Sequence, residues 1–181
     1  MKKAVFLDRD GVIVIPHFRD GRSFAVRSMD DFQLYPDAHA SLSLLKKAGF
    51  LLIVVTNQPD MGKGLIPPDI MAEMNNFLFQ HLPLESIMVC PHVKEEGCSC
   101  RKPKSGLLKE AAEAFNIDCA ASYMIGDRRS DVEAGKSIGC KTVFIDLGYA
   151  SEKKPKDANF SCQTLSEAAA WIVHNNEKMD Q

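Results

Sequence analysis

The feature that most constrains this chain is a regular alternation of short apolar runs with segments of helical pattern. Short apolar runs that alternate with helices are typical of parallel strands buried on both faces. The pattern therefore predicts an α/β fold, a three-layer Rossmann-like parallel sheet with helices on both faces. The expected strands are 3–7, 51–56, 86–89, 122–126 and 141–146, and the expected helices are 37–49, 67–78, 105–115, 131–138 and 165–174.

Length and composition indicate one domain. The chain has 181 residues, of which 45% are hydrophobic and 25% charged, as in a globular domain with a sizeable core. No repeat, low-complexity segment or linker divides it, so we expect residues 1–181 to form a single domain. The polar stretch from 16 to 35 is expected to be a long loop or small flap. No segment is long enough for a large cap domain.

The charge and the N-terminus exclude several classes of protein. A net charge of −2 argues against broad binding to nucleic acid or to an anionic membrane, because each needs a dense basic face. The apolar run Ala4–Leu7 is too short for a signal peptide, and no stretch approaches the roughly 20 apolar residues of a membrane span. We expect a cytoplasmic monomer with no nucleic-acid or membrane partner.

Two carboxylates one residue apart follow the first predicted strand. Asp8 and Asp10 flank Arg9, and Gly11 then lets the backbone turn sharply. Next to a divalent cation and a phosphoryl group, one carboxylate can attack phosphorus, and the other can protonate the leaving oxygen and later activate water. An Asp-rich turn without chemistry is the alternative. The position after a buried strand favours the catalytic interpretation.

The run from Leu7 to Ile13 resembles the first motif of the haloacid dehalogenase-like (HAD) phosphohydrolases. In that family the first Asp is the nucleophile and the second is the acid/base, which assigns these roles to Asp8 and Asp10. The other family motifs follow in order, and the resemblance covers almost the whole chain. It implies a HAD-like fold and a magnesium-dependent phosphatase that acts through an aspartyl-phosphate.

A threonine closes the second predicted strand, where the family has its second motif. The hydroxyl of Thr56 can orient phosphate oxygens without adding charge. A threonine that bonds only its own backbone is the alternative. Asn57 and Gln58 follow, and we expect both to contact the substrate.

A basic run precedes the third predicted helix. Lys102, in a Lys-Pro pair, matches the third-motif lysine of the family. A fixed ammonium near Asp8 would offset the repulsion between that carboxylate and a phosphate. Arg101 resembles a substrate-phosphate contact, which its planar fork suits. A solvated basic loop is the alternative, above all for Lys104.

A second acidic pair follows the fourth predicted strand and resembles the GDxxxD motif of the family. The resemblance makes Asp127 a magnesium ligand together with Asp8 and the backbone carbonyl of Asp10. Magnesium favours a few carboxylates completed by waters and phosphate oxygens. Asp131 either supports the magnesium site without touching the ion, or acts as an acid at a helix N-terminus.

Cysteine and histidine cluster between the third predicted strand and the basic run. Four soft or borderline ligands within eleven positions suit a tetrahedral zinc ion. We interpret the site as a structural zinc that staples the loop and aims Arg101 and Lys102 at the active site. A chance cluster of reduced cysteines and a catalytic zinc are the alternatives. The four expected ligands are Cys90, His92, Cys98 and Cys100.

Two branches of the family share this combination of motifs. The single-domain form and the run 101–108 resemble D-glycero-D-manno-heptose 1,7-bisphosphate phosphatases, which serve lipopolysaccharide-precursor synthesis. The short zinc loop and Gly126-Asp127-Arg128 resemble histidinol-phosphate phosphatases, and Pro59-Asp60 departs from the Ser-Gly pair of the heptose branch. We expect a sugar bisphosphate cleaved at its 7-phosphate, with Arg128 as a further substrate contact, and keep histidinol phosphate as the alternative.

Two functions of other kinds are less well supported. A non-catalytic, zinc-stapled binding domain would lack a catalytic carboxylate, and every expected carboxylate is present. A nucleic-acid 3′-phosphatase would need a basic groove, which the net charge of −2 does not indicate.

Overall fold

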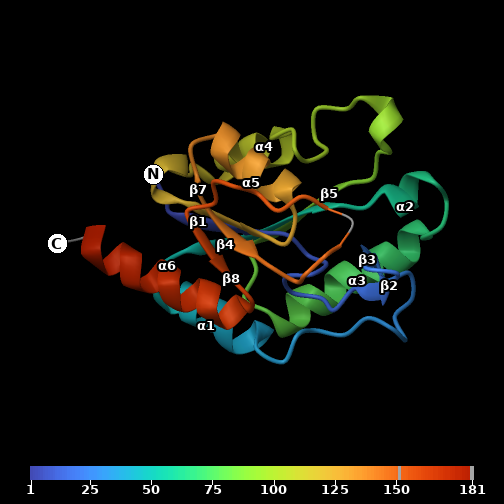
Figure 1. The fold of residues 1–181 in the computed structure, drawn as a ribbon, viewed down its shortest axis with the longest axis horizontal. Helices are drawn as coiled ribbons and strands as arrows, with labels where there is room; N and C mark the ends of the chain where they lie inside the picture. Colours follow the sequence, from blue (N-terminus) through green and yellow to red (C-terminus); the bar gives the residue numbers. More distant parts are fainter. Residues whose placement is uncertain (151, 180–181) are drawn as a thin grey trace.

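The computed structural model describes residues 1–150 and 152–179 and is built around one parallel sheet (Figure 1). Every neighbouring pair of strands runs parallel, which confirms the predicted sheet. In spatial order the strands are β5 (Ser86–Cys90), β4 (Leu51–Asn57), β1 (Ala4–Leu7), β6 (Tyr123–Gly126), β7 (Lys141–Ile145) and β8 (Phe160–Cys162).

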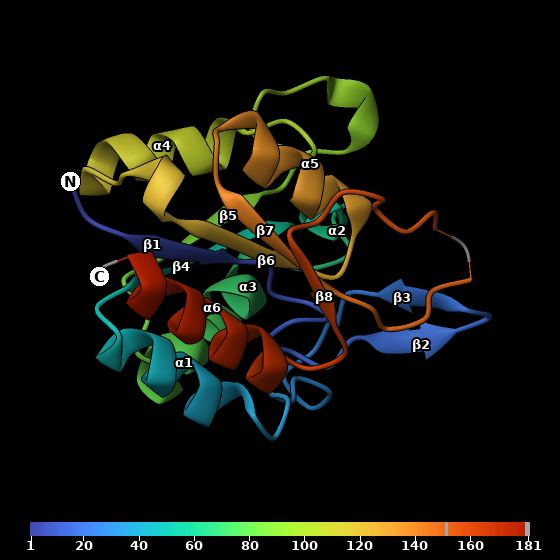
Figure 2. The same ribbon diagram turned by 60° about the vertical axis from the view of Figure 1, so that its left-hand side comes forward.

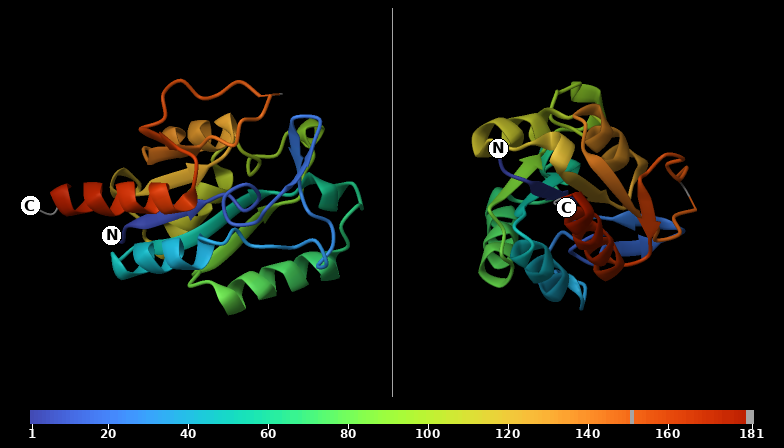
Figure 3. Two further views of the ribbon diagram at one scale, coloured as in Figure 1. Left: turned by 60° about the horizontal axis from the view of Figure 1, so that its bottom comes forward. Right: turned by 90° about the vertical axis from the view of Figure 1, so that its left-hand side faces the viewer.

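Helices cover both faces of this sheet, so the predicted three-layer arrangement is confirmed (Figures 2 and 3). A separate cluster of buried apolar side chains lies between the sheet and the helices on each face. One face carries α1 (Ala38–Lys47), α3 (Pro68–His81) and α6 (Leu165–Met179), and the other carries α4 (Gly106–Phe115) and α5 (Arg129–Ser137).

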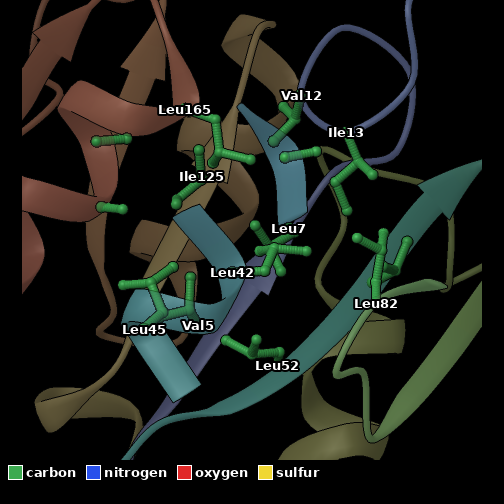
Figure 4. Packing of buried hydrophobic residues seen from close by; sticks show 14 of the residues in the cluster. Val5, Leu7, Val12, Ile13, Leu42, Leu45, Leu52, Leu82, Ile125 and Leu165 are labelled. Atoms are coloured by element: carbon green, nitrogen blue, oxygen red, sulfur yellow. The ribbon is translucent and has the colours of Figure 1, made fainter. Parts of the chain in front are cut away.

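The side chains of β1 point alternately into the two apolar cores. Val5 and Leu7 belong to the core beneath α1 and α6, and Ala4 and Phe6 belong to the core beneath α4. Successive residues of a strand point to opposite faces, so a fully apolar strand serves both cores. Figure 4 shows Val5 and Leu7 packed near Leu42 of α1. This burial holds the carboxyl end of β1, and with it Asp8, in a fixed place.

The C-terminal region differs from the prediction. The predicted helix ended at residue 174, but α6 continues to Met179. Asn176 is buried and accepts a hydrogen bond from the Lys3 ammonium at 3.0 Å, so the helix docks beyond the predicted end. The sheet also has a sixth strand, β8, which pairs with the free edge of β7 over three residues.

The expected flap contains a hairpin. The antiparallel strands β2 (His17–Arg19) and β3 (Arg22–Phe24) turn at residues 20 and 21, both with positive φ. Figure 2 shows the hairpin at the same end of the molecule as the loop that follows β7. A backbone hydrogen bond from Ala150 to Gly21 joins the two. Short helical turns complete the chain at α2 (Pro59–Gly62), η1 (Lys94–Glu96) and η2 (Cys119–Ala121).

Candidate active site

Three neighbouring strands bring the predicted polar residues to one edge of the sheet. Asp8 follows β1, Thr56 lies near the end of β4, and Asp127 follows β6. In parallel sheets this carboxyl edge is where ligands bind. A cleft of about 990 Å³ opens there, and its floor includes Asp8, Asp10, Thr56, Lys102 and Asp131.

Lys102 is the cation at the centre of this floor. Its Nζ lies 3.0 Å from Asp8 Oδ1 and 2.7 Å from Asp131 Oδ1, and it donates to the carbonyl of Val55 at 2.7 Å. Burial favours the neutral amine, but the two carboxylates outweigh it and raise the pKa of Lys102 above its ordinary value. The ammonium therefore stays charged beside Asp8.

Asn57 fixes the backbone that carries this lysine. Its Nδ2 donates to the carbonyl of Lys102, and its Oδ1 accepts from the Lys102 N–H, both at 3.0 Å. Asn57 also lines the cleft. In the structure it positions Lys102, and the predicted contact with substrate stays a prediction.

Arg9 and Gln58 hold Asp10. Arg9 has no exposed surface and meets the Asp10 carboxylate through Nε at 3.1 Å and Nη2 at 3.0 Å. Its guanidinium lies 5.5 Å from the centre of the Phe32 ring. Gln58 Nε2 donates to Asp10 Oδ2 at 2.6 Å. A buried arginine needs such a partner, and together Arg9 and Gln58 hold the Asp10 side chain in one position.

Gln58 differs from its predicted role. We expected it to contact the substrate, but it is fully buried and is not part of the cleft lining. Its Nε2 also donates to the hydroxyl of Thr56 at 2.9 Å. Gln58 therefore links Thr56 to Asp10 from behind and fixes the rotamers of both.

Asp127 lies deeper than Asp8. Its carboxylate is 1% exposed, and Oδ1 is buried with no hydrogen-bond partner within residues 1–150 and 152–179. Burial, Asp8 and Asp131 together hold the pKa of Asp127 well above its ordinary value. A buried, unpartnered carboxylate oxygen is costly unless a cation meets it. This oxygen is the observation that fits a metal ion here.

Asp131 makes two contacts, one at a helix terminus and one at the cleft floor. Its Oδ2 accepts the Arg128 N–H at 3.0 Å at the start of α5, which is the helix-terminal role. Its Oδ1 pairs with Lys102, which ties the helix to the cleft floor. Burial raises the pKa of Asp131 to about 6, against the lowering effect of Lys102. A side chain at Gly126 would lie 2.1 Å from Asp131 Cβ, so only glycine fits there.

Asp8, Asp127 and Asp131 form a compact group that we name the acidic cluster. Each offers a carboxylate oxygen, and these oxygens lie within 4.8 Å of one another. That spacing suits a magnesium ion completed by waters and phosphate oxygens. The Asp10 side chain is turned toward Arg9 and Gln58, so any ligand from Asp10 would be its backbone carbonyl, as expected from the sequence.

The predicted zinc ligands also come together. Cys90, His92, Cys98 and Cys100 form what we name the cysteine cluster, with ligand atoms within 4.8 Å of one another. Cys100 Sγ lies 3.1 Å from Cys90 Sγ and 3.4 Å from Cys98 Sγ, and His92 Nδ1 lies 3.2 Å from Cys100 Sγ. Zinc–sulfur bonds of about 2.3 Å set tetrahedral ligands somewhat under 4 Å apart. The donor set and its spacing therefore fit zinc.

Two basic residues donate hydrogen bonds to backbone carbonyls of the loop that carries this cluster. Lys104 donates to the carbonyls of Gly97 at 2.6 Å and Cys98 at 2.8 Å, so it is not a freely solvated charge. Arg101 Nη1 donates to the carbonyl of His92 at 3.2 Å and lines the cleft. The loop thus delivers Arg101 to the cleft wall and Lys102 to its floor.

The rim of the cleft is basic, and several of its arginines are paired. Exposed pairs of this kind stabilise a protein little, but they orient the guanidinium groups. Arg128 also donates to Ser23 Oγ of the flap at 2.6 Å and lines the cleft. The pairs are Arg27 with Asp60, Arg128 with Glu152, and Arg129 with Glu133.

Two residues of this site have contacts that the sequence does not indicate. Arg9 lies between the two motif aspartates, but its burial depends on Phe32 and on the Met71 and Met74 sulfur atoms, all from distant segments. Tyr149 donates a hydrogen bond to Asp127 Oδ2 from the loop after β7. No sequence motif marks either contact.

Comparisons with known proteins agree with this geometry. The family described as HAD-hydrolase-like matches residues 99–168. A D-glycero-beta-D-manno-heptose-1,7-bisphosphate 7-phosphatase of Pasteurella multocida is 35% identical, over 95% of this chain and 97% of the relative. One of the same name from Haemophilus ducreyi is 37% identical, over 94% and 98%.

A solved structure and a second kind of relative complete the comparison. D,D-heptose 1,7-bisphosphate phosphatase of B. bronchiseptica, complexed with magnesium and phosphate, superposes with a TM-score of 0.81 at 25% identity, covering 96% of this chain and 99% of that one. The histidine biosynthesis bifunctional protein HisB of Legionella pneumophila is 36% identical over 84% of this chain but only 44% of its own length.

Proposed function

This chain belongs to the HAD-like hydrolases, and within that family we propose that it is a magnesium-dependent phosphatase with Asp8 as its nucleophile. The observation that carries the proposal is the setting of Asp8. Its carboxylate faces the cleft at the end of β1, beside a buried ammonium and beside Asp10. A carboxylate so placed can form a covalent intermediate with a phosphoryl group.

In the first step Asp8 attacks phosphorus. Asp8 Oδ1 accepts the Arg9 N–H at 2.8 Å and pairs with Lys102, so Oδ2 is the oxygen that attacks. The new bond joins Oδ2 to phosphorus, and the bond from phosphorus to the sugar oxygen breaks. The charged Lys102 offsets the repulsion between the carboxylate and the phosphate.

Asp10 moves the protons in both steps. It gives its proton to the departing sugar oxygen, and it then accepts a proton from the water that attacks the phospho-Asp8. The second attack releases inorganic phosphate and restores the Asp8 carboxylate. Gln58 and Arg9 hold Asp10 at one position while its charge changes. Thr56 orients the phosphate oxygens from the neighbouring strand.

The acidic cluster fits the magnesium ion of this reaction. Asp8 and Asp127 would hold it, with the Asp10 carbonyl, and Asp131 would support them through Lys102. When bound, the ion supplies positive charge that neutralises the phosphoryl oxygens. The unpartnered Oδ1 of Asp127 is the feature of the described chain that supports this assignment.

The cysteine cluster fits a structural zinc ion. Its four protein ligands fill a tetrahedral site and leave no open position, so we assign it no chemistry. The loop it closes runs directly into Arg101 and Lys102. We propose that zinc fixes the path of this loop and thereby the wall of the cleft.

For the substrate we propose D-glycero-D-manno-heptose 1,7-bisphosphate, cleaved at the 7-phosphate. The relatives that match nearly the full chain carry this activity in their names. The cleft also suits two anionic groups, because its floor takes one phosphate and its rim is rich in cations. The rim cations are Arg27, Lys63, Lys94, Arg101, Lys104, Arg128, Arg129 and Lys153.

Histidinol phosphate remains the second candidate, supported by the match to HisB. Its ammonium and imidazole groups would bind best to a rim carboxylate that is not already paired with a cation. The rim carboxylates Asp60, Glu133 and Glu152 are already paired with arginines. The rim thus favours the bisphosphate.

Phosphate release with each substrate, with magnesium present, tests the proposal. We expect a kcat/KM for the heptose bisphosphate at least about 100-fold above that for histidinol phosphate, since a second bound phosphate contributes several charge-assisted hydrogen bonds. The Asp8→Asn variant serves as the blank. A preference for histidinol phosphate would overturn the substrate assignment and leave the phosphatase mechanism standing.

We further propose that residues 1–181 act as a single domain and a monomer on a small phosphorylated sugar. Across the part of the chain that is described, no helix has the length and apolar character to span a bilayer. The cleft and both metal-binding clusters lie within one three-layer unit. Gel filtration with light scattering tests the monomer: a larger mass would contradict it.

A further inference from the structure

Tyr149 meets the acidic cluster from a segment that belongs to none of the family motifs named above. It lies in the loop after β7, and its hydroxyl donates to Asp127 Oδ2. A carboxylate oxygen can only accept, so the Tyr149 hydroxyl is the donor in this contact.

The backbone of Gly11 lies against the same oxygen of Asp127 that accepts from Tyr149. A side-chain carbon at Gly11 would lie 2.2 Å from Asp127 Oδ2 and 3.0 Å from the Tyr149 hydroxyl. Oδ2 is thus enclosed between the Gly11 backbone and Tyr149. The other oxygen, Oδ1, is buried and has no hydrogen-bond partner in the described residues. One oxygen of Asp127 is held by protein, and the other is left for a cation.

The ring of Tyr149 is itself held from two sides. The Phe18 ring of the flap lies 5.7 Å away between centroids, and the Arg128 guanidinium lies 5.5 Å from the ring centre. Cation–π contacts of this kind favour one orientation of a ring. Arg128 is in turn bound to Ser23 of the flap. The hydroxyl therefore reaches Asp127 from a fixed direction.

We propose that Tyr149 is a positioning residue that fixes the rotation of the Asp127 carboxylate and thereby sets the affinity for the divalent cation. The inference rests on the magnesium site of the proposed function. Outer hydrogen bonds to metal-ligating carboxylates orient the ligands before the metal arrives, and their loss weakens metal binding. Tyr149 performs this task from the loop that also anchors the flap.

Calorimetric titration with Mg²⁺ tests the proposal without substrate. In Tyr149→Phe the ring and its contacts remain, and only the hydroxyl is lost. We expect the Kd for Mg²⁺ to rise about tenfold. In assays, half-maximal activity should need about tenfold more Mg²⁺, while kcat at saturating Mg²⁺ stays within about threefold of wild type. A Kd within about twofold of wild type would overturn the inference.

Two further variants make the result specific. Tyr123 has a buried hydroxyl with no hydrogen-bond partner among the described residues, so Tyr123→Phe is a matched loss of one hydroxyl and should leave the Mg²⁺ affinity unchanged. Asp127→Asn should bind Mg²⁺ much more weakly than wild type. If Asp127→Asn binds Mg²⁺ as wild type does, the magnesium site fails and the inference falls with it. If Asp127→Asn loses binding while Tyr149→Phe does not, only the role of Tyr149 is refuted.

Discussion

The acidic cluster takes its carboxylates from the ends of β1 and β6 and from α5, segments far apart in the sequence, whereas the cysteine cluster takes all its ligands from residues 90–100. Asp127 and Asp131 are almost fully buried at the carboxyl edge of the sheet. Of the cysteine cluster only Cys90 is buried, and the rest lies in a loop. The two clusters therefore depend on different parts of the structure.

The difference concerns what holds each group of ligands before a metal binds. The sheet and Lys102 hold the acidic cluster, so it is assembled by the fold and strained by its own negative charge. In the cysteine cluster, Cys90 ends β5 and lies in the apolar core, but the other three ligands lie in a loop, so the metal itself must supply much of the order of that loop. Lys102 follows Cys100 by two residues and connects the two clusters.

The largest effect is expected for Asp8→Asn, which should abolish turnover without lowering the stability of the acidic cluster. Asp8→Asn removes the nucleophile but keeps the size of the side chain, so turnover should fall by more than about 10⁴-fold. Because it also removes a charge from a repulsive group, thermal stability should not fall. Phosphate release and a melting curve check both parts. Retained turnover would show that Asp8 is not the nucleophile.

Lys102→Met tests the link between the clusters. The change removes the ammonium and leaves Asp8 and Asp131 without their shared cation. Breaking one side of a buried ion pair costs about 3–5 kcal/mol, so the free energy of unfolding in urea should fall by that amount. Adding Asp131→Asn should recover part of the loss. Unchanged stability in Lys102→Met would mean that the carboxylates are not held by charge.

The pH dependence of stability sharpens the contrast further. The pKa of Asp131 is raised to about 6, so the folded protein binds this proton more tightly than the unfolded chain does. The resulting stabilisation is complete below the ordinary carboxylate pKa and is lost as pH rises through about 6. In magnesium-free buffer the melting temperature should therefore fall across that interval. Asp127, whose pKa is raised as well, acts in the same direction, so Asp131→Asn should make the fall smaller without abolishing it. A melting temperature that rises instead would contradict the assignment.

The smallest effect is expected at the cysteine cluster. Cys98→Ser should reduce the bound zinc, measured by elemental analysis, and loosen the loop before Arg101. Because Asn57 holds the Lys102 backbone from the sheet, kcat should change little and KM should rise about three- to tenfold. Cys162→Ser, far from the cluster in β8, is the control. Protein purified without chelator that contains no zinc would refute the site.

Much of the fold was predictable because the relevant signals are local. Buried parallel strands such as 51–57 are continuous apolar runs, and the polar residue at each strand end marks the binding edge. The cysteine cluster was predictable for the same reason, since its spacing lies within one loop. The β8 strand was missed because three residues carry no usable period, and pairing with β7 alone creates it.

The details of the site were less predictable because they depend on contacts between distant segments. Gln58 was expected at the substrate, but Asp10 and Thr56 both accept from its amide, which turns it inward. Asn57 is likewise drawn to the backbone of Lys102. The sequence shows which residues stand at a strand end, but not which neighbour each side chain meets.

Gly11 and Gly126 give the acidic cluster its tightest constraint. Neither carries a side chain, yet an added carbon at Gly11 would strike Asp127, and one at Gly126 would strike Asp131. In a library of all single substitutions selected for activity, both positions should tolerate as few residues as the nucleophile does. Selection for folding alone should be more permissive at these positions than selection for turnover. The absence of a side chain at these two positions is thus as necessary to the site as any of its carboxylates.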